Sequence, residues 1–157
     1  MIFRFLTPEP IYSDFKFTLL QHSSTPLLQQ GLTMPTANIG DIQIYYEEQG
    51  QGQPLILILG LGQDIATWEY QIAELSRHVR LIVFDNRDTG LSSRCSDNYT
   101  TETMAQDALD LMDYLGIERM HLLGTSMGGM IAQHIALMAP ARLKSLILAS
   151  TTSWGEA

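Results

Sequence analysis

Cysteine, basic charge and long apolar runs are all scarce in this sequence. One cysteine among 157 residues, Cys95, leaves no internal disulfide framework and fits a reducing compartment. Nine Lys and Arg against 17 Asp and Glu give a formal charge of −8, which argues against nucleic acid as a partner. The best apolar run, residues 55–59, has the length of a strand, whereas a membrane span needs about 20 residues. The sequence therefore predicts a soluble, cytoplasmic protein with neither a nucleic-acid nor a membrane partner.

The first 33 residues differ from the rest of the chain. They show no sustained period of 2 or 3.6, and their prolines and Ser/Thr cluster are typical of loop. The total length suits one domain with a real core. We predict an irregular, poorly ordered extension over residues 1–33 and a single domain over residues 34–157.

From residue 34 onward, strand patterns alternate with helix patterns. Apolar strands are predicted over residues 54–60, 80–85, 120–124 and 143–150, and a hairpin over residues 38–50 turns at Gly40-Asp41. Helical spacing predicts helices over residues 67–79, 100–116 and 126–139. Strands that alternate with helices imply right-handed crossovers and a mostly parallel sheet. The predicted fold class is α/β, with three α/β/α layers.

The segment GTSMGGM, residues 124–130, lies between a predicted strand and a predicted helix. Gly124, Ser126 and Gly128 match the G-x-S-x-G pattern, in which a sharp strand-to-helix turn exposes a nucleophilic serine. Glycines two residues on either side relieve the collisions of such a turn, and the helix N-terminus aims amide groups at the site. The alternative is that Ser126 is only the N-cap of the helix.

Two further segments make the chain resemble the N-terminal half of an α/β-hydrolase-fold enzyme. LGLGQDIATW, residues 59–68, is similar to the family's oxyanion loop, with Leu59 in place of its usual histidine. FDNRDTGLSS, residues 84–93, resembles the family's Asp-x-Arg-Gly-x-Gly-x-Ser segment, with Asp88 in place of a glycine. This version is similar to that of aclacinomycin methylesterase-type hydrolases. The resemblance covers about 120 residues, so the expected fold is a truncated one that ends after the sixth strand.

The resemblance implies a site for acyl transfer to water. Ser126 would be the nucleophile, and the backbone N–H groups of Leu61 and Met127 would form the oxyanion hole. The substrate would be a small-molecule carboxylic ester or related acyl compound, and no metal or organic cofactor would be needed. Other residues would support the site structurally: Gly60, Gly124, Gly128, Asp85 and Arg87. For Asp88, a solvated turn is an equal alternative.

The acid and the histidine that follow the serine in this family have no counterpart in the sequence. His134 lies eight residues into the following helix, about 12 Å along its axis, and Glu156 lies next to the chain end. His22 is in the extension, His78 ends a helix, and His121 opens the fifth strand at its far end. The prediction is a serine hydrolase that lacks its acid and base. The alternative is a non-catalytic binding module or a gene fragment.

A dinucleotide-binding domain is a further alternative. Gly60-x-Gly62 follows a strand and Asp85 ends the next strand, but Ile65 stands where a third glycine belongs. No pair of residues shows the spacing of metal ligands.

The last predicted strand, residues 143–149, is apolar on both faces and would form an open sheet edge. Because an open edge offers unpaired main-chain groups to another chain, we expect self-association through it.

Overall fold

The computed structural model describes residues 35–153, and the prediction for residues 1–33 lies outside them. Six strands form one sheet in the order β1-β2-β4-β3-β5-β6. The pairs β1–β2 and β2–β4 are antiparallel, whereas β4–β3, β3–β5 and β5–β6 are parallel. The strands are β1 Thr36–Ile39, β2 Ile42–Gln49, β3 Pro54–Ile58, β4 Arg80–Phe84, β5 Met120–Thr125 and β6 Leu143–Ala149. The mostly parallel sheet that the sequence predicts is confirmed.

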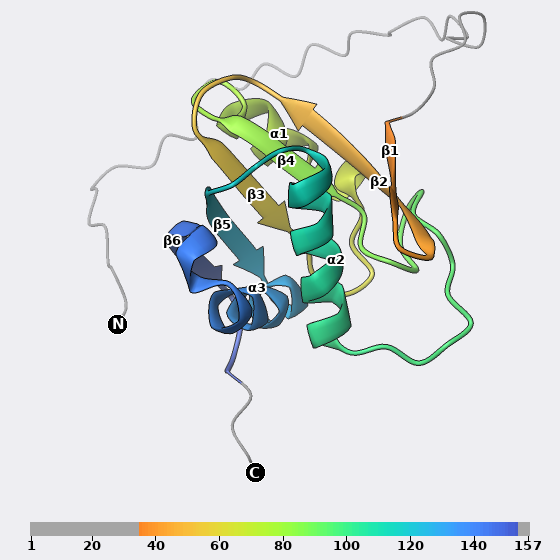
Figure 1. Cartoon of the computed structure of the whole chain (residues 1–157). Coiled ribbons are helices and arrows are strands. Elements are labelled where there is room, and N and C mark those ends of the chain that lie inside the picture. The colour runs from red at the N-terminus through yellow and green to blue at the C-terminus, as the bar shows by residue number, and fades with distance from the viewer. Residues whose placement is uncertain (1–34, 154–157) are drawn as a thin grey trace, which may run out of the picture. The chain divides into compact units, whose positions relative to one another are not determined.

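Three α-helices cover the two faces of the sheet. They are α1 (Glu69–Leu75), α2 (Thr101–Tyr114) and α3 (Met127–Met138), with 3-10 segments η1 (Ile65–Trp68) and η2 (Pro140–Arg142). α2 and α3 lie on one face and α1 lies on the other, which gives three layers (Figure 1).

The helix expected over residues 67–79 is shorter than its apolar spacing predicts. The N–H groups of His78 and Val79 both donate to the carbonyl of Leu75, at 3.0 and 3.2 Å, and so close the helix with a turn. Gly50, just after β2, packs so closely that a Cβ atom there would collide with the carbonyl of Ser76. The chain turns at this point because β4 must begin beside the end of β2.

The boundaries of α2 follow from its end residues. The hydroxyl of Thr100 accepts a hydrogen bond from the Thr103 N–H at 3.2 Å, and the Thr103 hydroxyl accepts one from the Thr100 N–H at 3.3 Å. This reciprocal cap satisfies N–H groups that a helix start leaves without partners. Gly116, at φ +67°, takes the left-handed conformation that ends the helix.

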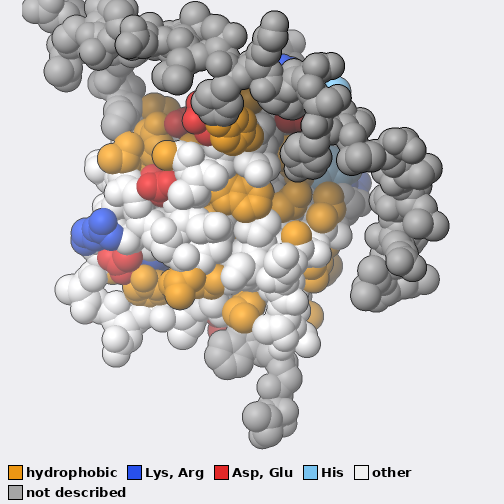
Figure 2. Space-filling model, turned by 180° about the vertical axis from the view of Figure 1, so that it is seen from behind, with side chains coloured by type: hydrophobic (Ala, Val, Ile, Leu, Met, Phe, Trp, Pro, Cys, Tyr) orange, Lys and Arg blue, Asp and Glu red, His pale blue; other side chains and the backbone are white. Residues whose placement is uncertain are grey.

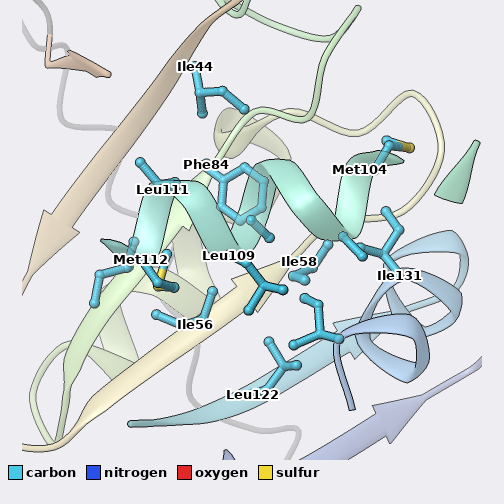
Figure 3. Close-up of a cluster of buried hydrophobic side chains, with 14 of the residues drawn as sticks. Ile44, Ile56, Ile58, Phe84, Met104, Leu109, Leu111, Met112, Leu122 and Ile131 are labelled. Atoms are coloured by element: carbon cyan, nitrogen blue, oxygen red, sulfur yellow. The ribbon is translucent and has the colours of Figure 1, made fainter. Parts of the chain in front are cut away.

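Alternate residues of the central strands pack into two separate cores. Ile56 and Ile58 of β3 face α2 and α3, together with Phe84 of β4 (Figure 3). Leu55 and Leu57 of β3 face α1. Because both faces of β3 are covered, the strand is apolar throughout, as the sequence predicts for a strand inside a parallel sheet.

Strand β6 is one of the two edges of the described sheet and carries exposed apolar side chains. Leu146, Ile147 and Leu148 keep 36, 47 and 43% of their surface exposed. These exposures match the open edge that the strand pattern predicts. Self-association through this edge stays a prediction.

Candidate active site

Ser126 lies in the sharp turn between β5 and α3, and its side chain is exposed. Its backbone angles are φ 51° and ψ −121°, a conformation that a non-glycine residue adopts only where its surroundings enforce it. The Ser126 N–H donates to the Ala149 carbonyl at 3.0 Å, and the Ser126 carbonyl accepts from the Gly129 N–H at 2.9 Å and the Thr151 hydroxyl at 2.7 Å. The strained turn is therefore fixed by the end of β6 and by the first turn of α3.

Three glycines around Ser126 are required by close packing. A Cβ atom at Gly124 would lie 2.8 Å from the Gly129 Cα. One at Gly128 would lie 2.6 Å from the Leu59 carbonyl oxygen, and one at Gly129 would lie 2.5 Å from the Thr151 Cβ. Real Cβ atoms keep contacts of about 3.5 Å, so none of these positions admits a larger residue without movement. The spacing of the G-x-S-x-G pattern thus has a direct steric cause.

The loop after β3 reaches the same place from another strand. A Cβ atom at Gly60 would lie 3.3 Å from the Cβ of Ser126, so the two residues are neighbours. Leu61 follows Gly60 and is 79% exposed. Met127 is the first residue of α3, where N–H groups have no acceptor inside the helix. The predicted nucleophile and both predicted donor residues therefore lie at one end of neighbouring strands β3 and β5.

Two side chains that no sequence motif singled out, those of Gln63 and Asn86, hold this loop. The Gln63 Oε1 accepts the Gly60 N–H at 2.9 Å and the Trp68 Nε1–H at 3.3 Å, and the Gln63 N–H donates to the Gly60 carbonyl at 3.2 Å. Asn86 donates its side-chain amide to the Leu59 carbonyl at 3.2 Å. Gln63 therefore holds Gly60 itself, and Asn86 holds the residue before it, Leu59. The only signal in the sequence is a polar side chain three residues after a glycine, which is typical of a local side-chain-to-backbone bond.

Asp85 joins two loops beneath the site. It is 2% exposed, and its two carboxylate oxygens accept the N–H of Ile65 at 2.9 Å and the N–H of Leu91 at 2.8 Å. Its own carbonyl accepts the hydroxyl of Ser92 at 2.6 Å, and the same hydroxyl accepts the N–H of Tyr45 from β2 at 2.9 Å. Both carboxylate oxygens of Asp85 therefore have main-chain partners, and the residue holds the loops after β3 and β4 together.

Arg87 forms a buried ion pair with Asp107 of α2. Two nitrogens of the guanidinium each lie 2.6 Å from a carboxylate oxygen, and the side chains are 10 and 9% exposed. The hydrogen bond with Asp107 holds the pKa of Arg87 above its ordinary value. The guanidinium also lies 5.2 Å from the ring centroid of Tyr99. Arg87 thus ties the loop after β4 to α2.

Asp88 shapes the loop and is more than a solvated turn. Its φ is +65°, in the left-handed region, where the resembling family segment has glycine. Aspartate tolerates this region better than most residues. Its carboxylate accepts the Cys95 N–H at 2.7 Å, and this bond, with one from Tyr99, holds the pKa of Asp88 below its usual range. Its N–H donates to the Ser93 carbonyl at 3.1 Å.

The structure brings no histidine of residues 35–153 to Ser126. His78 lies 3.4 Å from Glu74 on the exposed end of α1. His121 is hydrogen-bonded to the Ser145 hydroxyl at 2.8 Å. It is the second residue of β5, about 16 Å from Ser126 at the ordinary strand rise. His134 lies on α3, eight residues past the serine. His22 and Glu156 lie outside the described residues.

Residues 35–153 contain no group of three or more His, Cys, Asp or Glu side chains that could hold a metal ion. No helix there is both long enough and apolar enough to cross a membrane.

A sheet of this strand order, with a glycine-bounded serine turn at the carboxyl end of β5, defines one class of α/β protein. The chain belongs to the α/β-hydrolase-fold family, whose model matches residues 53–157. This membership favours the hydrolase interpretation of the sequence over the dinucleotide-binding alternative, since residues 60–62 lie within the segment that the family model matches.

Three relatives illustrate the range of the family. The chain is 36% identical over 124 residues to the "Putative carbamate hydrolase RutD" of Azorhizobium caulinodans, covering 79% of this chain and 46% of that protein. A solved hydrolase from Pseudomonas aeruginosa is 32% identical with a TM-score of 0.75, covering 81% of this chain and 49% of that one. An enol-lactonase from Burkholderia xenovorans is 32% identical with a TM-score of 0.72, and the match covers 74% of this chain and 46% of that one. The chain spans about half the length of the relatives it matches.

Proposed function

We propose that this protein supplies the nucleophile and the oxyanion donors of a serine hydrolase that acts on a carboxylic ester or a related acyl compound. The observation that carries the proposal is the exposed Ser126 in a strained turn, with Gly60 of the loop after β3 directly beside it. A serine held in this way resembles a nucleophile elbow. An N-cap alone would need neither the strain nor the neighbouring loop, and Ser126 makes no side-chain cap bond.

The proposed reaction begins with attack by the Ser126 Oγ on the carbonyl carbon. The Oγ–C bond forms, the hydroxyl proton passes to a base, and the negative charge moves to the carbonyl oxygen. The N–H groups of Leu61 and Met127 would stabilise that oxygen. The bond to the leaving group then breaks and the leaving group takes the proton, after which water releases the acyl group by the same steps.

The names of the relatives support an acyl substrate. A carbamate and an enol-lactone each present a carbonyl carbon that is bonded to a heteroatom leaving group. The part that this chain shares with them includes the elbow and the loop after β3. Since the pockets of this fold differ between members, the class of bond is the finest statement that the shared part supports.

The base is the missing component of the proposed site. A serine hydroxyl is a weak nucleophile until a base takes its proton, and no histidine of residues 35–153 reaches Ser126. Efficient turnover therefore requires a histidine and an acid from polypeptide outside this region. The same observation favours a second candidate, a non-catalytic hydrolase-like binding module.

Chemical rescue separates the two candidates. The full chain is incubated with p-nitrophenyl acetate, with and without imidazole as an external base, and acylated residues are identified by mass spectrometry. If Ser126 is a poised nucleophile, imidazole accelerates its acylation, and Ser126→Ala abolishes that increase. Ser145→Ala is the matched control, because Ser145 is an exposed serine that already contacts a histidine, His121.

Equal acylation of Ser126 and Ser145, or an imidazole effect that survives Ser126→Ala, contradicts the proposal. Circular dichroism of each variant shows that the fold is retained. A folded chain that shows no adduct at Ser126 under any condition identifies the binding module instead.

A further inference from the structure

A groove between β2 and α1 lies apart from the proposed site. Its volume is about 590 Å³, within the range of about 300–1,000 Å³ that small-molecule sites occupy. Ile65 and Ile72, which are 7 and 4% exposed, form an apolar floor, and Leu91 adds a further apolar side chain to the lining. Ser126 does not line it, and two strands, β4 and β3, separate β2 from β5 in the sheet. The groove is therefore a second candidate site within the described residues.

The polar lining of the groove is acidic. Glu47 of β2 and Glu69 of α1 contribute carboxylates from the two elements that form the groove, and Asp64 and Asp85 contribute two more. No Lys or Arg among residues 35–153 lines the groove. On this face of the molecule, acidic side chains lie among hydrophobic ones (Figure 2).

Internal hydrogen bonds leave the charge of Glu47 uncompensated. Its two oxygens accept the hydroxyl of Tyr45 at 2.9 Å and the side-chain amide of Gln49 at 3.0 Å, and both donors are neutral. No ion pair of residues 35–153 includes Glu47 or Glu69. Burial and the nearby Glu47 raise the pKa of the Tyr45 hydroxyl to about 12, as expected beside a negative group.

We propose that this groove binds a small organic cation, an amine whose apolar part lies on Ile65 and Ile72 and whose ammonium group lies beside Glu47 and Glu69. Apolar contact supplies most of the attraction, because exposed ion pairs contribute little by themselves. The carboxylates determine which ligands bind. They repel an anion, and they favour a cation over a neutral molecule of the same shape.

A pair of isosteric probes tests this binding. Hexylammonium and hexan-1-ol have similar shapes and differ in charge, and the amine is protonated at neutral pH. Each is titrated into the ¹⁵N-labelled full chain, and the amide shifts of Ala66 and Ala73, which both line the groove, are followed. We expect hexylammonium to bind about two- to fivefold more tightly than hexanol, the range that a solvent-exposed ion pair gives.

Two variants test whether the preference for hexylammonium over hexan-1-ol arises in the groove. Glu47→Gln removes one of the two charges beside the ammonium group, keeps the acceptor for Tyr45, and should reduce the preference while hexanol binding is unchanged. Glu102→Gln, an exposed glutamate on α2 across the sheet, removes the same charge and should leave the preference intact. On the unaltered chain, raising NaCl from about 0.05 M to about 0.5 M should weaken hexylammonium binding selectively, which keeps the test independent of how the variants fold.

Three results would overturn the proposal. Equal affinity for the two probes would show that the acidic lining selects nothing. Shift changes confined to residues outside the groove would place the binding elsewhere. An equal loss of preference in Glu47→Gln and Glu102→Gln would show an effect of net charge alone.

Discussion

Replacing Gly128 with alanine would test how closely α3 approaches β3 beneath Ser126. The added Cβ would lie 2.6 Å from the Leu59 carbonyl oxygen, and closer still to that of Ile58. Both neighbours are main-chain atoms at the end of a central strand, so neither can rotate away. We expect the variant to fold with lower stability and with α3 displaced from the sheet.

The size of the effect follows from the contact distances. Non-bonded heavy atoms ordinarily keep about 3.5 Å, so the start of α3 would have to move by about 1 Å. Overpacking a core costs about 1–3 kcal/mol, and rigid neighbours put this position near the upper end. Alanine recovers about 1 kcal/mol over glycine inside a helix. The net loss of about 2 kcal/mol would lower the Tm by about 8 °C for a domain of this size.

Thermal denaturation followed by circular dichroism would measure this loss, and Gly129→Ala offers a matched control. At Gly129 the obstacle is a side chain, because the added Cβ would lie 2.5 Å from the Thr151 Cβ. Thr151→Gly removes that obstacle, so Gly129→Ala should cost much less in the Thr151→Gly background than in the native chain. A Gly128→Ala variant as stable as the native chain would refute the packing that we derive for the elbow.

Three further predictions concern the loop after β4 and the edge of the sheet. Asp107→Ala should cost about 3–5 kcal/mol in urea denaturation, because it leaves a buried guanidinium unpaired; Asp110→Ala, a half-buried carboxylate on the same helix, should cost far less. Asp88→Ala should be less stable at pH 7. Since folding lowers the pKa of Asp88, its contribution is full above its unfolded pKa of about 3.9 and is lost as the pH falls through the lower folded value. The deficit of the variant should therefore shrink in acid, and a deficit that does not change with pH would contradict this cause. Ile147→Lys should reduce concentration-dependent association in sedimentation velocity, whereas Leu137→Lys, at an 81% exposed position on α3, should not; a native chain that stays monomeric at every concentration would exclude pairing through β6.

Much of the fold could be predicted because its signals are local. The apolar run of residues 54–60 indicates a strand covered on both faces, and β3 has this environment. Gly116 marks the end of α2, and Gly124 and Gly128 mark the turn around Ser126. Each of these signals depends on neighbours in the sequence, through strand or helix period or through backbone sterics.

The supporting contacts of the site could not be predicted in the same way. Asp88 was assigned equally to a solvated turn, and its role depends on the N–H of Cys95, which the loop brings back to it. Asn86 bonds to the carbonyl of Leu59 across 27 positions of sequence. Such partners depend on the register of strands and on the path of loops, which no local pattern specifies.

By itself, therefore, the sequence determined the alternation of strands and helices, the sheet type and the glycine-bounded serine. Tertiary structure alone decided that Gly60 adjoins Ser126, that no histidine of residues 35–153 does, and that carboxylates of β2 and α1 face one groove. The physical reason is the range of the forces involved. Backbone sterics and hydrophobic period act within a few residues, whereas a site is assembled by packing, which joins side chains that the chain itself keeps far apart.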